Sequence, residues 1–204
     1  MNRIEKIFQI RSEKVIPFLT AGYPSKDDTV DMVLAAGESG AAMVELGMPF
    51  SDPLADGPII QEASQKAIEN GVNISWILEM VTEIRKKSEI PLALMGYINP
   101  IIKYGIKHFI HDCKNAGVDG LIIPDLPPEE AGELLQLAND AGICTILLVA
   151  PNTENERIRD ISKLAGTLIY CVAILGITGE TGANVSELKK YLKRVQENSE
   201  CPFV

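Results

Sequence analysis

The feature that most constrains the fold is a regular alternation of two kinds of segment. Short apolar runs, rich in β-branched residues, recur about every 25 residues, as strands do when helices separate them. They span residues 14–22, 41–48, 90–97, 120–126, 144–150 and 167–173. Between them lie stretches with apolar residues at helical spacing, at 27–40, 74–88, 106–117, 129–142 and 155–166, and most of these end in Gly. Such an order predicts parallel strands joined by crossover helices.

The strands are apolar almost throughout, which is typical of strands covered on both faces. A doubly wound sheet and a (β/α)8 TIM barrel both satisfy this pattern. The polar residues favour the barrel, because they follow every strand rather than one switch point, and the rim after the strands is where barrels bind ligands. These residues are Thr20, Glu45, Tyr97, Asn99, Asp125, Asn152 and Thr178.

We therefore predict a single (β/α) barrel domain over residues 1–204, with strands one to six and the start of a seventh at 201–204. Complete barrels of this class have eight strands and about 250 residues. The sequence thus predicts a chain truncated at its C-terminus, without the rest of the seventh strand and without the eighth.

The composition excludes several classes of function. A net charge of −9 disfavours nucleic-acid and anionic-membrane surfaces, which need clustered Lys and Arg. The N-terminus lacks the apolar core of a signal peptide, and no apolar run reaches the length of a membrane span. The four cysteines, Cys113, Cys144, Cys171 and Cys201, form no CxxC pair. Buried free thiols in the cytoplasm are the expectation.

Glu45 is the first candidate catalytic residue. The strand period of two places Met43, Glu45 and Gly47 on one face and Val44 and Leu46 on the other. Val44 and Leu46 suit the layer against the helices, so Glu45 points toward the barrel axis. Desolvation there raises the pKa of a carboxyl group toward the range of a proton-transfer catalyst. A structural carboxylate satisfied by backbone N–H groups or a Lys is the alternative.

Two more acids follow in the turn SDPLADGP. Pro58 suits the first position of a helix, so local signals favour Asp56 as a helix N-cap or Asx-turn residue. Asp52 has the same local interpretation, or it faces a partner protein.

Two further patterns carry less information. The loop with Gly176, Gly179 and Gly182 could cradle a phosphate or act as a lid. His108 and His111 are three residues apart on a predicted helix far from the rim, and we expect a surface or hydrogen-bonded pair there rather than a metal site.

The ordered blocks PFLTAGYPS, VELGMPFSDPLADGPIIQ, ALMGYINPI, GVDGLIIPDLPPEE, LLVAPNT and YCVAILGITG resemble those of the tryptophan synthase alpha subunit family. The resemblance implies a lyase that cleaves indole-3-glycerol phosphate to indole and glyceraldehyde 3-phosphate in tryptophan biosynthesis. It implies Glu45 and Asp56 as the catalytic acid/base residues. It also implies substrate-binding positions at Phe18, Thr20, Tyr97, Asp125, Tyr170, Thr178 and Gly179.

The resemblance further implies an alpha2beta2 complex with a beta subunit. Asp52 and Pro53 match positions that face this partner, and the partner, rather than this chain, carries pyridoxal phosphate. The chain differs from many relatives at Ala173 and Ile174, where they carry Ser and Arg. A catalytically weak protein that only binds the beta subunit is one alternative. Another barrel enzyme acting on a phosphorylated substrate is a second.

Overall fold

Parallel strands alternate with helices in the computed structural model, which describes residues 1–10, 14–173 and 185–204. The strands are β1 (Phe18–Thr20), β2 (Val44–Gly47), β3 (Leu92–Met95), β4 (Gly120–Ile122), β5 (Cys144–Thr145), β6 (Leu147–Val149) and β7 (Ile169–Cys171). The helices are α1 (Arg3–Phe8), α2 (Asp28–Glu38), α3 (Pro58–Glu69), α4 (Ile74–Arg85), α5 (Ile98–Tyr104), α6 (Ile106–Ala116), α7 (Gly132–Ala141), α8 (Asn155–Ala165) and α9 (Val185–Asn198). Every apolar run and every amphipathic stretch of the sequence falls on a strand or a helix of the predicted type.

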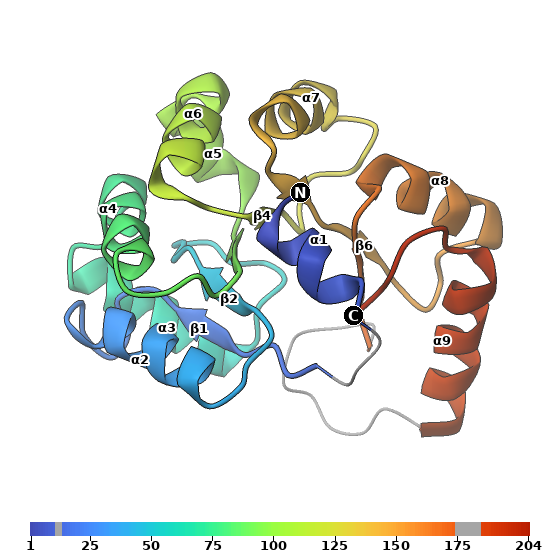
Figure 1. Ribbon diagram of the computed structural model, residues 1–204, viewed down its shortest axis with the longest axis horizontal. Coiled ribbons are helices and arrows are strands. Elements are labelled where there is room, and N and C mark those ends of the chain that lie inside the picture. The colour runs from blue at the N-terminus through green and yellow to red at the C-terminus, as the bar shows by residue number, and fades with distance from the viewer. Residues whose placement is uncertain (11–13, 174–184) are drawn as a thin grey trace.

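The strands pair in sequence order and all in parallel. The first five form one sheet in the order β1-β2-β3-β4-β5, and β6 pairs with β7. Residues 144–149 form one extended run whose first part pairs with β4 and whose last part pairs with β7. Phe203 makes a parallel bridge to Ile169, as predicted for the start of a seventh strand at 201–204. Figure 1 shows the helices arranged around this curved succession of strands.

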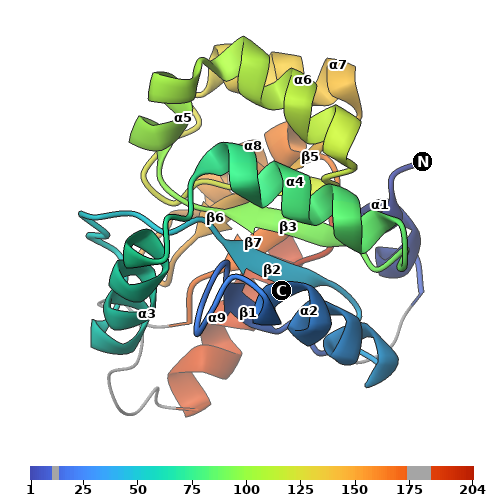
Figure 2. The same cartoon turned by 90° about the vertical axis from the view of Figure 1, so that its left-hand side faces the viewer.

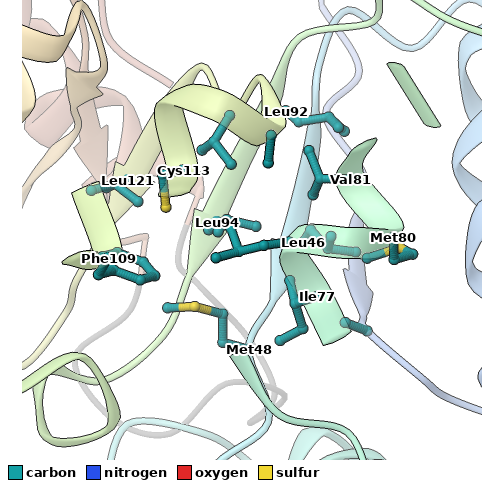
Figure 3. Packing of buried hydrophobic residues seen from close by; sticks show 14 of the residues in the cluster. Leu46, Met48, Ile77, Met80, Val81, Leu92, Leu94, Phe109, Cys113 and Leu121 are labelled. Atoms are coloured by element: carbon teal, nitrogen blue, oxygen red, sulfur yellow. The ribbon is translucent and has the colours of Figure 1, made fainter. Parts of the chain in front are cut away.

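The alternation of side chains along the strands sorts the core into two layers. Leu46, Leu94 and Leu121 point outward and pack against α4 and α6, where Ile77 and Phe109 are buried (Figure 3). A second cluster lies inside the strands and is formed by Ile4, Met43, Ala93, Ile122, Cys144, Ile146 and Leu168. Met43 therefore faces inward, while Val44 and Leu46 face the helices, as the strand period predicted.

Helix α1 closes the amino-terminal ends of the strands. Asn2 caps the helix and its side-chain amide donates to the carbonyl oxygens of Asp119 and Gly142. Ile4 is fully buried and fits against Gly120, where a Cβ atom would lie 2.7 Å from the Ile4 Cδ1. Figure 2 shows α1 at one end of the strands, with the loop before α3 at the other. Six residues are too few for a periodic signal, so sequence patterns did not reveal α1.

A buried ion pair anchors the same end of the strands. The Asp119 carboxylate accepts from Arg85 at 2.6 Å and from Arg3 at 3.0 Å, and also from the backbone N–H of Leu92. Asp119 is 3% exposed, so its charge depends on these partners. Arg3 belongs to α1, Arg85 ends α4 and Asp119 precedes β4, so one carboxylate joins three elements. Throughout the described residues, no helix is long and apolar enough to cross a lipid bilayer.

Candidate active site

Glu45 lies in the middle of β2, a strand whose four residues are all buried. Its side chain is 5% exposed and lines a cavity of about 930 Å³ together with Phe18, Tyr170 and Phe203. Burial raises the pKa of Glu45 from its ordinary 4.5 to about 7, because an anion is poorly solvated in the protein interior. This direction agrees with the prediction from the sequence. Glu45 is thus a carboxyl group that can hold or release a proton near neutral pH.

Tyr170 and Lys14 reach the same cavity from distant parts of the chain. Burial raises the pKa of Tyr170, and the negative charge of Glu45 adds to this effect, so the two side chains lie within electrostatic range. Lys14 also lies over the ring of Phe8, 5.3 Å from its centroid. Sequence spacing gave no indication that a lysine lines this cavity. The sequence did place Tyr170 here, through the family resemblance.

Asp56 lies in a separate, much smaller pocket of about 20 Å³, which Phe18, Thr20 and Tyr97 also line. Its Oδ2 accepts a hydrogen bond from the Tyr97 hydroxyl at 3.1 Å. Burial raises the pKa of Asp56, and the hydrogen bond from Tyr97 opposes this rise. The local interpretation of Asp56 as a helix N-cap is wrong. Gly57 is the N-cap of α3, and no side chain caps that terminus.

Phe18 lines both pockets. Phe18 pairs with Glu45 across the β1–β2 ladder. The ring can occupy this place because Gly47, two residues further along β2, has no side chain. A Cβ atom at Gly47 would come within 2.5 Å of the Phe18 Cζ. Phe18 is thus a residue that the pocket of Glu45 and the pocket of Asp56 share.

Comparison with known proteins shows which family the chain belongs to. The family model described as tryptophan synthase alpha chain matches residues 5–204. The tryptophan synthase alpha chain of Petrotoga mobilis is 46% identical over 203 residues, which cover all of this chain and 78% of that protein. The chain belongs to the tryptophan synthase alpha chain family.

Solved structures agree with this assignment. Tryptophan synthase subunit alpha from Legionella pneumophila superposes with a TM-score of 0.91 at 36% identity, and the match covers all of this chain and 77% of that one. A structure of the tryptophan synthase α2β2 complex from Pyrococcus furiosus matches with a TM-score of 0.85 at 37% identity, over 94% of this chain and 77% of that one. The predicted family and the predicted (β/α) barrel are confirmed. The chain is a lyase of the alpha type, which acts in tryptophan biosynthesis.

Not every predicted site residue of this alpha chain reaches the two pockets. Asp125 is exposed, and its Oδ1 accepts from the backbone N–H of Ile98 at 3.0 Å, so it supports the start of α5. Asn99 and Asn152 are also exposed and line neither pocket. Thr178, Gly179 and Ile174 lie outside the described residues, as do Gly176 and Gly182, whereas Ala173 is described and exposed.

Ser64 lines the pocket of Asp56 but did not emerge from the sequence. It is 4% exposed on α3, between the buried residues Ala63 and Ala67. Its position on the apolar face of an amphipathic helix is the sequence signal that could have identified it. His108 and His111 are exposed on α6, and no cluster of potential metal ligands occurs among the residues that the structure describes. Cys113, Cys144 and Cys171 are buried free thiols, as predicted, and Cys201 is half-buried.

Proposed function

We propose that the chain cleaves indole-3-glycerol phosphate to indole and glyceraldehyde 3-phosphate by a retro-aldol reaction. Its catalytic acid/base residues are Glu45 and Asp56. The observation that carries this proposal is the buried carboxyl group of Glu45, whose pKa burial raises to about 7. Its pocket shares Phe18 with the pocket of a second carboxyl group, that of Asp56. Two carboxyl groups in different environments can divide the tasks of acid and base.

The proton transfers balance with these two groups alone. Asp56, as a carboxylate, accepts the proton of the indole nitrogen while protonated Glu45 donates a proton to indole C3. The Glu45 carboxylate then accepts the proton of the hydroxyl on the glycerol carbon that is bonded to C3. The bond between this glycerol carbon and C3 breaks. The aldehyde of glyceraldehyde 3-phosphate forms, and the electron pair of the broken bond restores the indole ring. Asp56 returns its proton to the nitrogen, so both residues end as they began.

The pKa of each group suits its task. A Glu with a pKa of about 7 is protonated in about half of the molecules at neutral pH, so the acid required at C3 is present. Asp56 has to be ionised before the reaction, and the hydrogen bond from Tyr97 favours that ionised form. We expect a bell-shaped pH dependence, with loss of activity above about pH 7 as Glu45 loses its proton.

The substrate-binding assignments are part of the proposal. Phe18 offers an aromatic surface to the indole ring, and Thr20, Tyr97 and Tyr170 line the two pockets that flank it. Thr178 and Gly179 remain predicted contacts of the substrate and its phosphate, and Asp125 remains a predicted site residue that acts from the start of α5. The carbon–carbon cleavage is coupled to proton transfers, which carboxyl groups can carry out without a cofactor in this chain.

A beta subunit carrying pyridoxal phosphate is the proposed partner. The loop before α3 protrudes at the carboxyl ends of the strands (Figure 2). It contains Asp52 and Pro53, and Leu54 beside them is 91% exposed. An apolar side chain this exposed next to a charged one is typical of a protein-binding surface. The same loop ends at Asp56, so a partner seated on it would contact the catalytic segment.

The decisive experiment measures indole released from indole-3-glycerol phosphate by the purified chain, with and without a beta subunit. We expect Glu45→Gln and Asp56→Asn each to lower kcat at least 100-fold, since general acid–base groups contribute about 10²–10⁴-fold. Glu79→Gln, at an exposed site on α4, is the matched control and should keep full activity. Retention of most activity in Glu45→Gln would refute the assignment. A wild-type chain that binds the beta subunit but releases no indole would refute the function.

A further inference from the structure

The Tyr97 hydroxyl lies at the junction between the loop before α3 and the end of β3. It accepts a hydrogen bond from the Ala55 backbone N–H at 3.0 Å and donates to Asp56 Oδ2 at 3.1 Å. Tyr97 lies two residues after the end of β3 and is the N-cap residue of α5. The two contacts therefore join segments that are 41 and 42 residues apart in the sequence. One hydroxyl group fixes both the backbone before Asp56 and the carboxylate itself.

The Tyr97 ring is held firmly enough to orient another group. It is 5% exposed, and the ring of Phe50 packs against it with the centroids 5.3 Å apart. The next residue in the chain, Ile98, donates its backbone N–H to Asp125. Packing on one side and an anchored backbone on the other leave the hydroxyl little freedom. An aspartate on a loop gains a fixed direction from such a partner.

Among the described residues, the structure shows a side-chain hydrogen bond to one of the two oxygens of the Asp56 carboxylate. Oδ2 accepts from Tyr97, and the side chain lies at the wall of the small pocket. We propose that Tyr97 is a positioning residue for Asp56, which orients the carboxylate and stabilises its anionic form so that the other oxygen can accept a proton from the substrate. This inference rests on the proposed function, in which Asp56 is a base. It assigns to Tyr97 a task beyond lining the pocket.

The electrostatic surroundings of Asp56 allow the task to be measured. Apart from Tyr97, the described side chains that line its pocket with Asp56 carry no titratable group. They come from β1, the end of β2, α3, the end of β3 and the segment after β4: Phe18, Thr20, Met48, Ile60, Ser64, Met95 and Pro124. Burial raises the pKa of Asp56, and Tyr97 is the group that lowers it. Burial, together with the charges of Asp56 and Asp125, raises the pKa of Tyr97 to about 12, so the hydroxyl keeps its proton at any working pH.

The test compares Tyr97→Phe with the wild type. We expect the pKa of Asp56, followed by ¹³C NMR of labelled aspartate carboxyl groups and assigned with Asp56→Asn, to rise by about one pH unit when the donor is lost. The acid limb of the pH profile of kcat/KM should move upward by the same amount, since the base must be ionised. Activity on the plateau should fall less than in Asp56→Asn. A residue with only a structural role would change stability and leave both pKa readouts in place.

Tyr104→Phe is the matched control. Tyr104 lies on α5 and donates to Asp112 at 2.7 Å, so this variant also removes one tyrosine–aspartate hydrogen bond, but away from the pocket. It should leave the pKa of Asp56 unchanged. Should Tyr97→Phe prove unstable, Phe50→Leu loosens the Tyr97 ring and keeps its hydroxyl, and a smaller rise in the pKa of Asp56 is expected. An Asp56 pKa and acid limb that stay at their wild-type values would overturn the inference. The NMR titration needs no substrate, so an inactive wild type would refute the proposed function separately.

Discussion

Replacing Glu45 with Gln should stabilise the protein at alkaline pH while it removes the catalytic acid. Burial raises the pKa of Glu45 from 4.5 to about 7, so the folded protein holds this proton more tightly than the unfolded chain does. Below pH 4.5 the carboxyl group is protonated in both the folded and the unfolded state and does not lower the free energy of unfolding. As the pH rises to about 7, only the unfolded chain loses the proton easily, and stability falls. Above pH 7 the loss is complete.

The size of this effect follows from the same two values. A difference of about 2.5 pH units corresponds to about 3 kcal/mol, since each unit is worth 1.36 kcal/mol. Gln has a similar shape and no ionisable proton, so it avoids this loss. We expect Glu45→Gln to match the wild type near pH 4.5 and to exceed its free energy of unfolding by about 3 kcal/mol at pH 8.

Urea unfolding at a series of pH values from 4.5 to 8 measures this difference directly. The midpoint of Glu45→Gln at pH 8 should exceed that of the wild type by about 1 M urea, with an unchanged slope. Glu79→Gln, which replaces an exposed glutamate of α4, should show no such pH-dependent gain. A Glu45→Gln protein that is no more stable than the wild type at pH 8 would refute the argument that Glu45 is a destabilising buried acid.

Three further perturbations test the fold and the proposed interface. Arg85→Ala leaves the buried Asp119 charge without its 2.6 Å partner and should lower the free energy of unfolding, measured in urea, by about 3–5 kcal/mol. A loss below 1 kcal/mol would contradict the view that Arg85 compensates this buried charge. Gly47→Ala places a Cβ atom against the ring of Phe18 and should lower the free energy of unfolding by about 1–3 kcal/mol. Adding Phe18→Leu should reduce this loss, whereas additive losses of the two single variants would contradict a direct clash. Leu54→Asp places a charge on an exposed apolar position and should weaken binding of a beta subunit at least tenfold by calorimetry, with an unchanged Tm; unaltered affinity would remove this loop from the proposed interface.

Much of the fold was predictable because each strand and helix carries its own periodic signal. The alternation of apolar runs and amphipathic stretches predicted a parallel α/β barrel, and the period of two along β2 correctly placed Glu45 on the inner face. Helix α1 escaped prediction, since its six residues are fixed by contacts with Asp119 and Gly120 rather than by a pattern of their own.

The candidate site, like the fold, was predictable from the sequence only in part. Burial of Glu45 follows from its position in an apolar strand, so the sequence alone predicted a raised pKa. The local signal at Asp56 pointed to a helix cap, because Asp before a proline-initiated helix is common at such termini. Asp56 instead accepts a hydrogen bond from the Tyr97 hydroxyl, and Tyr97 lies 41 residues away at the start of α5.

Local sequence patterns establish which side chains face inward, because the geometry of a strand or a helix assigns every residue to a face. They also establish the order of the strands around the barrel, since short crossover connections keep successive strands adjacent. Which of these side chains meet depends on how the distant segments pack together. Asp56 with Tyr97 and Asp119 with Arg3 are hydrogen bonds between distant segments, and Glu45 with Tyr170 is an electrostatic interaction between two more. No local period encodes them, because they arise when the strands close around a common core.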